Sequence, residues 1–415
     1  MTEIQHELKV SVQGLKVGMF VCRLDRPWLE AKVLMQGLMI EDEDTLRHLQ
    51  QVCRYVYVDV MRGEAPELRF VEYAEPDVVQ NERSRQEIAA LRKTTWQLQA
   101  SVEEERAQAE GAFVDAQSSI DQMMSDLQQG KRLDLKQLRH GVTAMVDSIL
   151  RNPSALTWVR EIRRSNEYAY QHAMGCSIWA ASFGRHLGLE REELHNLALG
   201  GLLSDVGKTQ LPMELLSKPP PLSAQEAQLV REHVKYSLEI VQSITGLHPK
   251  VLEMVATHHE RHNGSGYPAG LRGSEIPIFG RIMGIVDSYD AMTCVRPYAH
   301  SRAPHQAVAE LYSHRGTLFQ PELVEQFIQA CGIYPTGSLV ELSNGEVGVI
   351  TAVHSLKRLR PSVMVLLDKD KRPLSNFRTV DLEQVEYDEA GQPLAIRSGL
   401  PAGAHGIDPQ ELFLD

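Results

Sequence analysis

Six side chains that can bind metal ions stand out between residues 160 and 300 of the sequence. They are four histidines and two aspartates: His172, Asp205, His233, His258, His259 and Asp287. Apolar residues flank each of them at helical spacing, so each side chain can point toward the protein interior. A single inward histidine is more often an ordinary core residue than a ligand. Six such groups on five helical segments are harder to explain in that way, because buried charge is costly unless it is paired or metal-bound.

The mixture of imidazoles and carboxylates narrows the kind of ion that this cluster would hold. Such a donor set suits iron, manganese, zinc or nickel. A carboxylate shared by two ions would keep them ~3.5–4 Å apart, which is the spacing of hydrolytic two-metal sites. The sequence therefore predicts a hydrolytic metal centre.

A glycine-rich loop follows the paired histidines directly, in the segment HHERHNGSGYPAG. Gly264 and Gly266 would let the backbone approach a ligand closely, since glycine has no Cβ atom. Tyr267 can stack on a ligand or donate a hydrogen bond to it, and Pro268 stiffens the loop. Immediately behind His-His-Glu, these residues predict a loop at the mouth of the metal centre.

The elements that must position these groups form a mainly α protein. Residues 134–330 alternate apolar helical patterns with short polar turns, which predicts one all-helical domain. Residues 82–130 favour a long helix, which would be either a spacer packed on its neighbours or a dimerisation or signal-relay helix. Residues 6–60 predict a small α/β module with strands in ELKVSV, MFVCRL and YVYVDV and a helix over 42–52. Period-two apolar patterns over 334–390 predict strands, the first two joined at Asn344-Gly345 as a hairpin.

These patterns divide the chain into four expected parts. A small α/β domain occupies 1–65, and a linker with the long helix occupies 66–133. The all-helical domain occupies 134–332. A β-hairpin unit and an irregular tail occupy 333–415.

The bulk composition limits the classes of function. The chain has 415 residues and is 43% apolar and 24% charged, which is ordinary for a globular protein. Its five cysteines form no CxxC pair, so neither a disulfide framework nor a thiolate zinc site is expected. No signal pattern or stretch of ~18 apolar residues is present, which predicts a cytoplasmic protein without a membrane span. The net charge of −12 argues against direct DNA binding but permits a small anionic ligand at a local positive site.

The motifs together resemble a known family. The region from about residue 165 to residue 331, with GLLSDVGK, HHERHNGSGYP and DSYDAM, resembles an HD-GYP domain. This is a branch of the HD metal-dependent phosphohydrolases, and its known members are cyclic-di-GMP phosphodiesterases with two or three metal ions. Residues 6–60 are similar to the small domain often found ahead of HD-GYP domains. The resemblance implies hydrolysis of cyclic-di-GMP to pGpG, and further to GMP, in the bacterial signalling that controls biofilm and motility.

The resemblance also implies a role for each site residue. For the first metal the implied ligands are His172 and Asp287, for the second His233, His258 and His259, and Asp205 bridges the two. Asp205 and Lys208 would be the catalytic residues. Lys208 and Arg296 would contact the substrate phosphate, and Gly266, Tyr267 and Pro268 would shape the substrate cleft. The implied cofactors are two divalent ions, iron or manganese first, with zinc, nickel or magnesium as alternatives.

The sequence departs from the family pattern at three positions. Ser204 stands where the family has the histidine of its His-Asp pair, so the first metal keeps three protein ligands and we expect it to bind more weakly. Tyr168 stands where members with a third metal carry a glutamate, which favours two ions. Ala299 stands three positions after Arg296, where a basic residue is common, so one phosphate contact is expected to be lost.

Two nearby residues leave alternatives open. Cys176, four residues after His172, is either a thiolate that replaces the missing imidazole or an ordinary core cysteine. Asp290, three residues after Asp287, is either an outer-shell partner of the metal ligands or a solvent-side carboxylate.

The function also has alternatives. A degenerate domain would be a non-catalytic cyclic-di-GMP sensor or a protein-interaction module, and a third reading is another phosphohydrolase such as a nucleotidase. Diguanylate cyclases of the GGDEF type are candidate partners, and the helix over 82–130 is a candidate homodimer contact.

Overall fold

The computed structural model describes most of the chain and divides it into two compact units, Met1–Gln86 and Glu87–Asp415. The described residues are 7–26, 37–59, 62–64, 66, 70, 85–163, 168–218, 221–294, 301–353, 360–388, 390–401 and 403–407. Among the helices that this description covers, none combines the length and apolar character that crossing a membrane requires. The domain boundaries given above stay a prediction.

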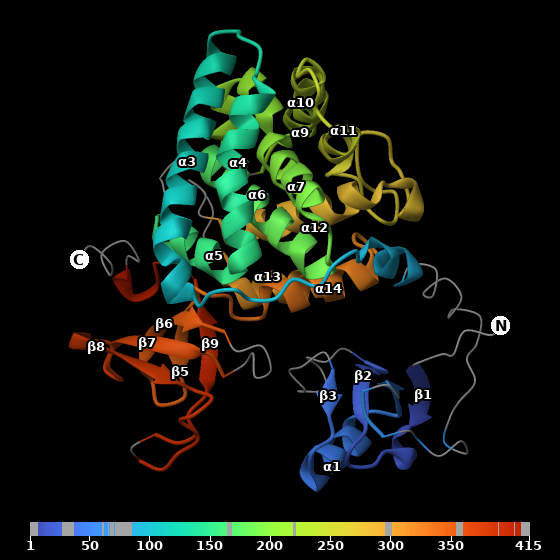
Figure 1. Ribbon diagram of the computed structural model, residues 1–415, viewed down its shortest axis with the longest axis vertical. Coiled ribbons are helices and arrows are strands. Elements are labelled where there is room, and N and C mark those ends of the chain that lie inside the picture. The colour runs from blue at the N-terminus through green and yellow to red at the C-terminus, as the bar shows by residue number, and fades with distance from the viewer. Residues whose placement is uncertain are drawn as a thin grey trace. The chain divides into compact units, whose positions relative to one another are not determined.

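The first unit is a four-stranded sheet with one α-helix; three of the strands and the helix were predicted, and the short β3 was not (Figure 1). Its elements are β1 (Glu7–Ser11), η1 (Val12–Gly14), β2 (Phe20–Leu24), β3 (Leu38–Met39), α1 (Glu43–Val52) and β4 (Tyr55–Asp59). The strand order is β1-β4-β2-β3, and all pairs are antiparallel. Asp42 begins α1, since its Oδ1 accepts the backbone N–H of Thr45 at 2.6 Å. Alternate residues of β4, Val56 and Val58, are buried in the small core of this unit.

The second unit is built from helices that share one large core. Its helices are α3 (Val102–Gln128), α4 (Leu135–Arg151), α5 (Pro153–Ile162), α6 (Tyr168–Leu187), α7 (Arg191–Leu203), η3 (Val206–Gln210), α8 (Met213–Leu216), α9 (Ala224–Arg231), α10 (His233–Gln242), α11 (Pro249–Thr257), η4 (Gly273–Glu275), α12 (Ile278–Thr293), α13 (Pro304–Ser313) and α14 (Pro321–Cys331). Every residue of α7 from Leu194 to Leu203 is buried, which is the pattern of a central helix. This arrangement confirms the predicted mainly α fold with an all-helical domain.

The prediction of one helix over 82–130 is wrong in its middle. Residues 85–91 are helical, but residues 92–101 are not, and α3 begins after them. Tertiary contacts hold this segment: the backbone N–H groups of Lys93 and Thr94 donate to the carbonyl of Gly188 at 2.8 and 3.0 Å, and the Trp96 indole donates to the Leu189 carbonyl at 2.9 Å. These bonds outweigh the helical propensity of the segment.

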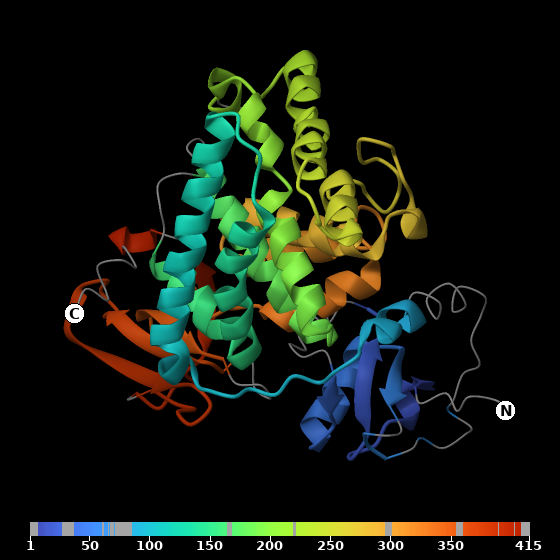
Figure 2. The ribbon, with the colours of Figure 1, turned by 45° about the horizontal axis from the view of Figure 1, so that its top comes forward.

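Helix α3 packs along α4 and α5 inside the second unit, as both ribbon views show (Figure 2). Its side chains Ala109, Phe113 and Ile120 belong to the main core. Ser101 begins the helix with a capping box, in which its hydroxyl and the Glu104 carboxylate each accept a backbone N–H of the other residue. The apolar face of α3 is therefore used within its own chain.

The chain ends in a five-stranded antiparallel sheet with order β8-β7-β6-β5-β9. Its elements are β5 (Leu339–Leu342), β6 (Val347–Ala352), β7 (Ser362–Leu367), β8 (Pro373–Asp381) and β9 (Ile396–Leu400), followed by η5 (Ala404–Gly406). The hairpin of β5 and β6 is confirmed, and Gly345 has the positive φ of 87° that its turn requires. The expectation of an irregular end is wrong for β9, which pairs with β5. Gly399 and Ser398 interrupt the apolar alternation there, so sequence periodicity did not reveal the strand.

Candidate metal centre

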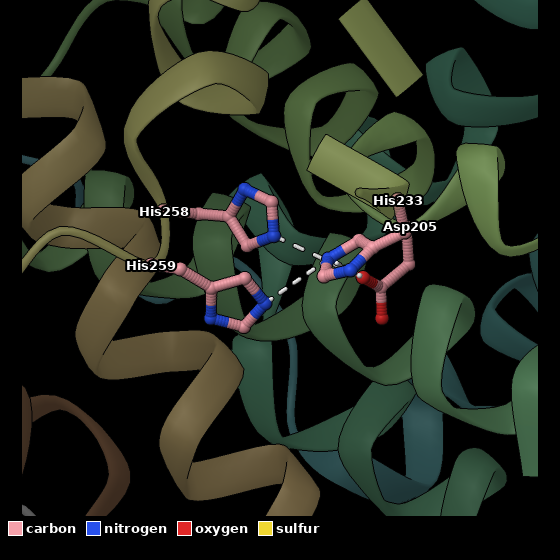
Figure 3. Close-up of side chains that lie close together, drawn as sticks. All are labelled: Asp205, His233, His258 and His259. Carbon is pink, nitrogen blue, oxygen red and sulfur yellow. Dashed lines mark hydrogen bonds and ion pairs between the residues drawn. The ribbon is translucent and has the colours of Figure 1, made fainter. Parts of the chain in front are cut away.

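The structure brings all six predicted ligands together in two overlapping groups. Four residues, Asp205, His233, His258 and His259, place one ligand atom each within 4.8 Å of one another. We call them the three-histidine group; Figure 3 shows their side chains pointing toward one another. His172, Asp205 and Asp287 form a second set of the same compactness, which we call the one-histidine group. Asp205 belongs to both.

Separate elements deliver these side chains to one place. His172 lies in the second turn of α6, Asp205 follows the end of α7, and His233 begins α10. His258 and His259 follow α11 directly, and Asp287 lies within α12. Helices α6 and α7 approach closely at Gly201, where a Cβ atom would lie 2.6 Å from backbone atoms of Cys176. A larger residue at that crossing would force apart the helices that carry His172 and Asp205.

Hydrogen bonds to backbone carbonyls place a proton on Nδ1 in two rings of the three-histidine group. The Nδ1 atom of His233 lies 2.6 Å from the Val230 carbonyl, and that of His258 lies 2.9 Å from the Val255 carbonyl. A carbonyl only accepts, so each Nδ1 carries a proton, and each ring turns its Nε2 toward Asp205. Oδ1 of Asp205 lies 3.2 Å from Nε2 of His233 and 3.8 Å from Nε2 of His258. Two ring nitrogens thus face one carboxylate oxygen.

Two of these atoms lack a hydrogen bond. Within the described residues, Asp205 Oδ1 and His258 Nε2 are buried and lack a hydrogen-bond partner. Orphaned buried acceptors cost free energy unless a ligand meets them. A divalent cation placed between them would satisfy both, so the donor set fits a metal ion.

The single imidazole of the one-histidine group is oriented by a side chain and not by a backbone carbonyl. Nε2 of His172 lies 3.1 Å from Oδ1 of Asp287 and 3.4 Å from Oδ2 of Asp205. On the other side of the ring, Nδ1 lies 2.8 Å from Oδ2 of Asp290. Asp290 is fully buried, so the alternative of a solvent-side carboxylate is wrong and the outer-shell partner is confirmed. The His172 ring donates to that carboxylate and turns its other nitrogen toward Asp205 and Asp287.

Ser204 contributes nothing to either group. It is 3% exposed, and its hydroxyl donates to the carbonyl of Gly200 at 2.6 Å, one helical turn back. The ligand position that a histidine would supply is therefore not taken by the serine hydroxyl.

Cys176 is not arranged as a replacement ligand. Its Sγ lies 3.7 and 3.8 Å from the two ring nitrogens of His172, and it groups with His172 and Asp290 rather than with Asp205 and Asp287. Burial raises the pKa of the Cys176 thiol to about 12, although His172 opposes this. At neutral pH the group is a protonated thiol, as in an ordinary core cysteine.

The electrostatics keep both carboxylates ionised and the His259 imidazole neutral. Burial would raise the pKa of Asp205, but the Lys208 ammonium at 2.5 Å and hydrogen bonds from three histidines hold it well below its usual value. Burial also opposes ionisation of Asp287, yet the His172 hydrogen bond and the charge of His259 lower its pKa. Burial first, and His258 next, lower the pKa of His259 well below the usual value. These are the protonation states that metal ligands need.

The glycine-rich loop lies against the three-histidine group. The Tyr267 ring stacks on the His259 ring, with centroids 4.7 Å apart and planes 27° apart. Gly266 passes so close to the preceding turn that a Cβ atom would lie 2.5 Å from the His259 carbonyl. Pro268 follows Tyr267 in the same loop. The buried Glu260 carboxylate accepts the N–H groups of residues 269, 270 and 271 at 2.7, 3.1 and 3.0 Å, which fastens the loop.

Three described cations lie beside the cluster: Lys208, Arg231 and Arg261, whose Nη1 donates to the His258 carbonyl at 3.0 Å. Lys208 is paired with Asp205, as noted. Sequence reasoning missed Arg231, an exposed residue whose guanidinium lies 5.0 Å from the centroid of the Tyr267 ring. Its place two residues before His233 was the available signal. Arg296, the other predicted phosphate contact, and Ala299 lie outside the described residues.

Comparison with known proteins agrees with this geometry. A family model described as an HD domain matches residues 157–323. A domain of unknown function (DUF3391) matches 7–138, and a KOW domain associated with HD domain matches 339–386.

Similar curated proteins carry related names. The chain is 29% identical over 400 residues, 95% of this chain and 92% of the other, to a cyclic di-GMP phosphodiesterase of Pseudomonas aeruginosa. It is 35% identical over 167 residues, 38% of this chain and 44% of the other, to a cyclic di-GMP phosphodiesterase response regulator of Xanthomonas campestris. It is 36% identical over 159 residues, 38% of this chain and 30% of the other, to a 3′3′-cGAMP-specific phosphodiesterase of Vibrio cholerae.

The helical fold and its clustered histidines and aspartates define an HD-type, metal-dependent phosphohydrolase domain. The HD domain match and the names of the similar proteins support the HD-GYP family for this domain.

Proposed function

We propose that this protein hydrolyses a phosphodiester bond of cyclic-di-GMP with the help of two divalent metal ions. The names of its relatives support the substrate. The observation that carries the proposal is the pair of buried polar atoms without a hydrogen-bond partner among the described residues, Asp205 Oδ1 and His258 Nε2, in a cluster of carboxylates and imidazoles. Such a cluster suits a cation, and hydrolytic enzymes use paired cations for phosphoryl transfer.

The two groups divide the metal ligands. Residues of the three-histidine group would hold one ion, those of the one-histidine group the other, and Asp205 would touch both. Iron or manganese fits the donor set, with zinc, nickel or magnesium as alternatives. When bound, the ions lower the pKa of water and neutralise phosphate oxygens. The one-histidine group offers a single imidazole, so we expect it to bind its ion more weakly.

The remaining residues bind and orient the substrate. Lys208 is 25% exposed in its side chain and can turn from Asp205 to a non-bridging phosphate oxygen once other cations neutralise that carboxylate. Tyr267 stands on His259 and presents its ring and hydroxyl to the cleft, next to Gly266 and Pro268. Arg296 keeps its proposed role as a phosphate contact.

The proposed reaction is a hydrolysis that balances without another reactant. The oxygen of a water molecule bonds to phosphorus as the bond from phosphorus to the 3′ oxygen breaks. The 3′ oxygen takes up a proton, and the product is linear pGpG. A second hydrolysis of pGpG would give GMP. GGDEF-type diguanylate cyclases, which make the substrate, are the proposed functional partners.

The position of Ser204 favours a second candidate function. Its hydroxyl is committed to the Gly200 carbonyl, so the first metal has one protein ligand fewer than the family pattern provides. A domain that loses this metal would bind cyclic-di-GMP without cleaving it and act as a sensor.

Turnover of the full chain separates these candidates. The protein would be stripped of metal, reconstituted with Mn²⁺ or Fe²⁺ without oxygen, and given cyclic-di-GMP or 3′3′-cGAMP. Formation of pGpG by the wild type, but not by Asp205→Asn, is the expected result. Binding without product in the wild type, together with turnover in Ser204→His, would establish the sensor instead. Faster cleavage of 3′3′-cGAMP would correct the substrate, and neither binding nor cleavage of a dinucleotide would overturn the proposal.

A further inference from the structure

A buried arginine lies behind the one-histidine group and does not touch the predicted ligands themselves. Arg160, on α5, is 9% exposed, and its Nη2 donates to Oδ1 of Asp290 on α12 at 2.5 Å. The second oxygen of Asp290 accepts the Nδ1–H of His172 on α6 at 2.8 Å. Three helices are thus joined through one carboxylate that is fully buried.

Helix α6 leaves room for this ion pair at a single glycine. A Cβ atom on Gly175 would lie 2.1 Å from Oδ1 of Asp290 and 2.5 Å from Nη2 of Arg160. Any other residue would displace one of the two charged groups. The segment HAMGC therefore carries both the metal-binding histidine and the space for the groups that orient it.

The other histidines that have a fixed Nδ1 partner do not depend on such a pair. His233 and His258 donate to carbonyls of the residues three positions earlier, Val230 and Val255, so the local backbone orients their rings. His172 instead relies on a side chain that is held in place by a cation from another helix. A buried carboxylate that loses its cation is strongly destabilised, and the surrounding structure rearranges to relieve it.

We propose that Arg160 is a positioning residue for the first metal, acting through Asp290 on His172, and that Ser204 makes the chain unusually dependent on it. With one imidazole left in the one-histidine group, the direction of its Nε2 lone pair decides how well that group holds an ion. Loss of an outer-shell partner typically weakens metal binding ~10–100-fold. The effect is confined to the one-histidine group, because the hydrogen-bond partners described for Arg160 are Asp290 and Glu161 and not the rings of the three-histidine group. The inference rests on the proposed two-metal centre but not on turnover.

Manganese binding to the metal-free full chain tests the inference without any substrate. The free Mn²⁺ concentration is followed by the electron paramagnetic resonance signal of the hydrated ion, which gives a tighter and a weaker site. We expect Arg160→Met to weaken the weaker site ~10–100-fold and to change the tighter site less than threefold. Arg160→Lys keeps the positive charge and should recover part of the loss. It also provides a measurement if Arg160→Met does not fold.

A matched control comes from a second ion pair with a buried carboxylate. Arg151 donates to the Glu105 carboxylate at 2.6 and 2.8 Å, and Glu105 is 2% exposed. Arg151→Met should lower thermal stability without changing either manganese site. The dependence on Ser204 is tested by combining Arg160→Met with Ser204→His. In this background, Arg160→Met should lower the manganese affinity of the weaker site several-fold less than it does in the wild type.

Several results would overturn the inference. These are an unchanged weaker site in Arg160→Met, equal weakening of both sites, the same site-selective loss in Arg151→Met, or an undiminished loss in the Ser204→His background. The proposed function fails separately, by absence of turnover in a wild type that holds two manganese ions. The two claims are therefore distinguishable in the same preparation.

Discussion

The two halves of the metal cluster differ in how their histidines are held. In the three-histidine group, backbone carbonyls orient two of the rings, and the third ring stacks on Tyr267. In the one-histidine group, a single ring depends on the buried carboxylate of Asp290. The first arrangement is local to each helix, whereas the second requires three helices to meet.

This difference explains how the chain can tolerate Ser204. In the proposed two-metal centre, the serine would leave one imidazole in the half that is supported by long-range contacts, while the half with local support has three. We infer that the two halves differ in affinity and that the weaker half sets the metal requirement of the protein. The predictions below probe that contrast.

The largest effect is expected from the residue that both halves share. Asp205→Asn removes the negative charge that faces His172, His233 and His258, at nearly constant side-chain volume. Metal binding should fall at both sites by more than the ~10–100-fold that loss of an outer-shell partner costs. Elemental analysis and manganese titration measure this. Full retention of one ion per chain would show that Asp205 does not join the two halves.

Partial removal of metal should show directly that the two groups bind their ions with unequal affinity. A weak chelator is expected to take the ion of the one-histidine group first, so one ion per chain remains while turnover is lost. Ser204→His adds an imidazole to that half and should bring the two ions closer to equal retention. Ser204→Ala is the matched control, because the serine hydroxyl contacts only the Gly200 carbonyl among the described residues. Simultaneous loss of both ions from the wild type would contradict the inequality.

The clustering of the six candidate ligands was predictable from the sequence. Each ligand is a polar residue at a defined place in an apolar helical pattern, and the glycine-rich loop marks the end of one such helix. The predicted strand pattern over 338–368 was confirmed for the same reason, since its apolar alternation is strong. Periodicity reports which face of an element is buried, and that was sufficient for these residues.

The supporting contacts were not predictable in that way. Arg160 and Asp290 are separated by 130 residues, and no local pattern pairs them. The non-helical residues 92–101 follow from bonds to Gly188 and Leu189, which only the folded chain brings near. Periodicity carries no information on partners, so the sequence could locate His172 but not the group that orients it.

A smaller effect is expected at the cleft, on substrate rather than metal. Arg231 is exposed and lies over the Tyr267 ring, where its charge can attract a dinucleotide to a protein of net charge −12. Arg231→Ala should raise KM about fivefold, equivalent to ~1 kcal/mol, and leave kcat and both metal affinities unchanged. Steady-state kinetics at low and high salt provide the measurement. Lys235→Ala, which removes another exposed cation near His233, should change KM less. A lower kcat in Arg231→Ala would instead place this residue in the chemical step.

The smallest effect on metal binding is expected from Cys176. Burial raises the pKa of this thiol to about 12, and Cys176 groups with His172 and Asp290 rather than with Asp205 and Asp287, so we expect no thiolate ligand in the half that lacks an imidazole. Cys176→Ala should therefore leave both manganese affinities unchanged and cost only ~1 kcal/mol of stability from lost packing. The cobalt-loaded wild type should show no sulfur-to-cobalt charge-transfer absorption. The opposite result would be a band that Cys176→Ala abolishes together with metal binding at the weaker site. The thiolate would then have replaced the histidine, and the two halves would be more alike than their hydrogen bonds indicate.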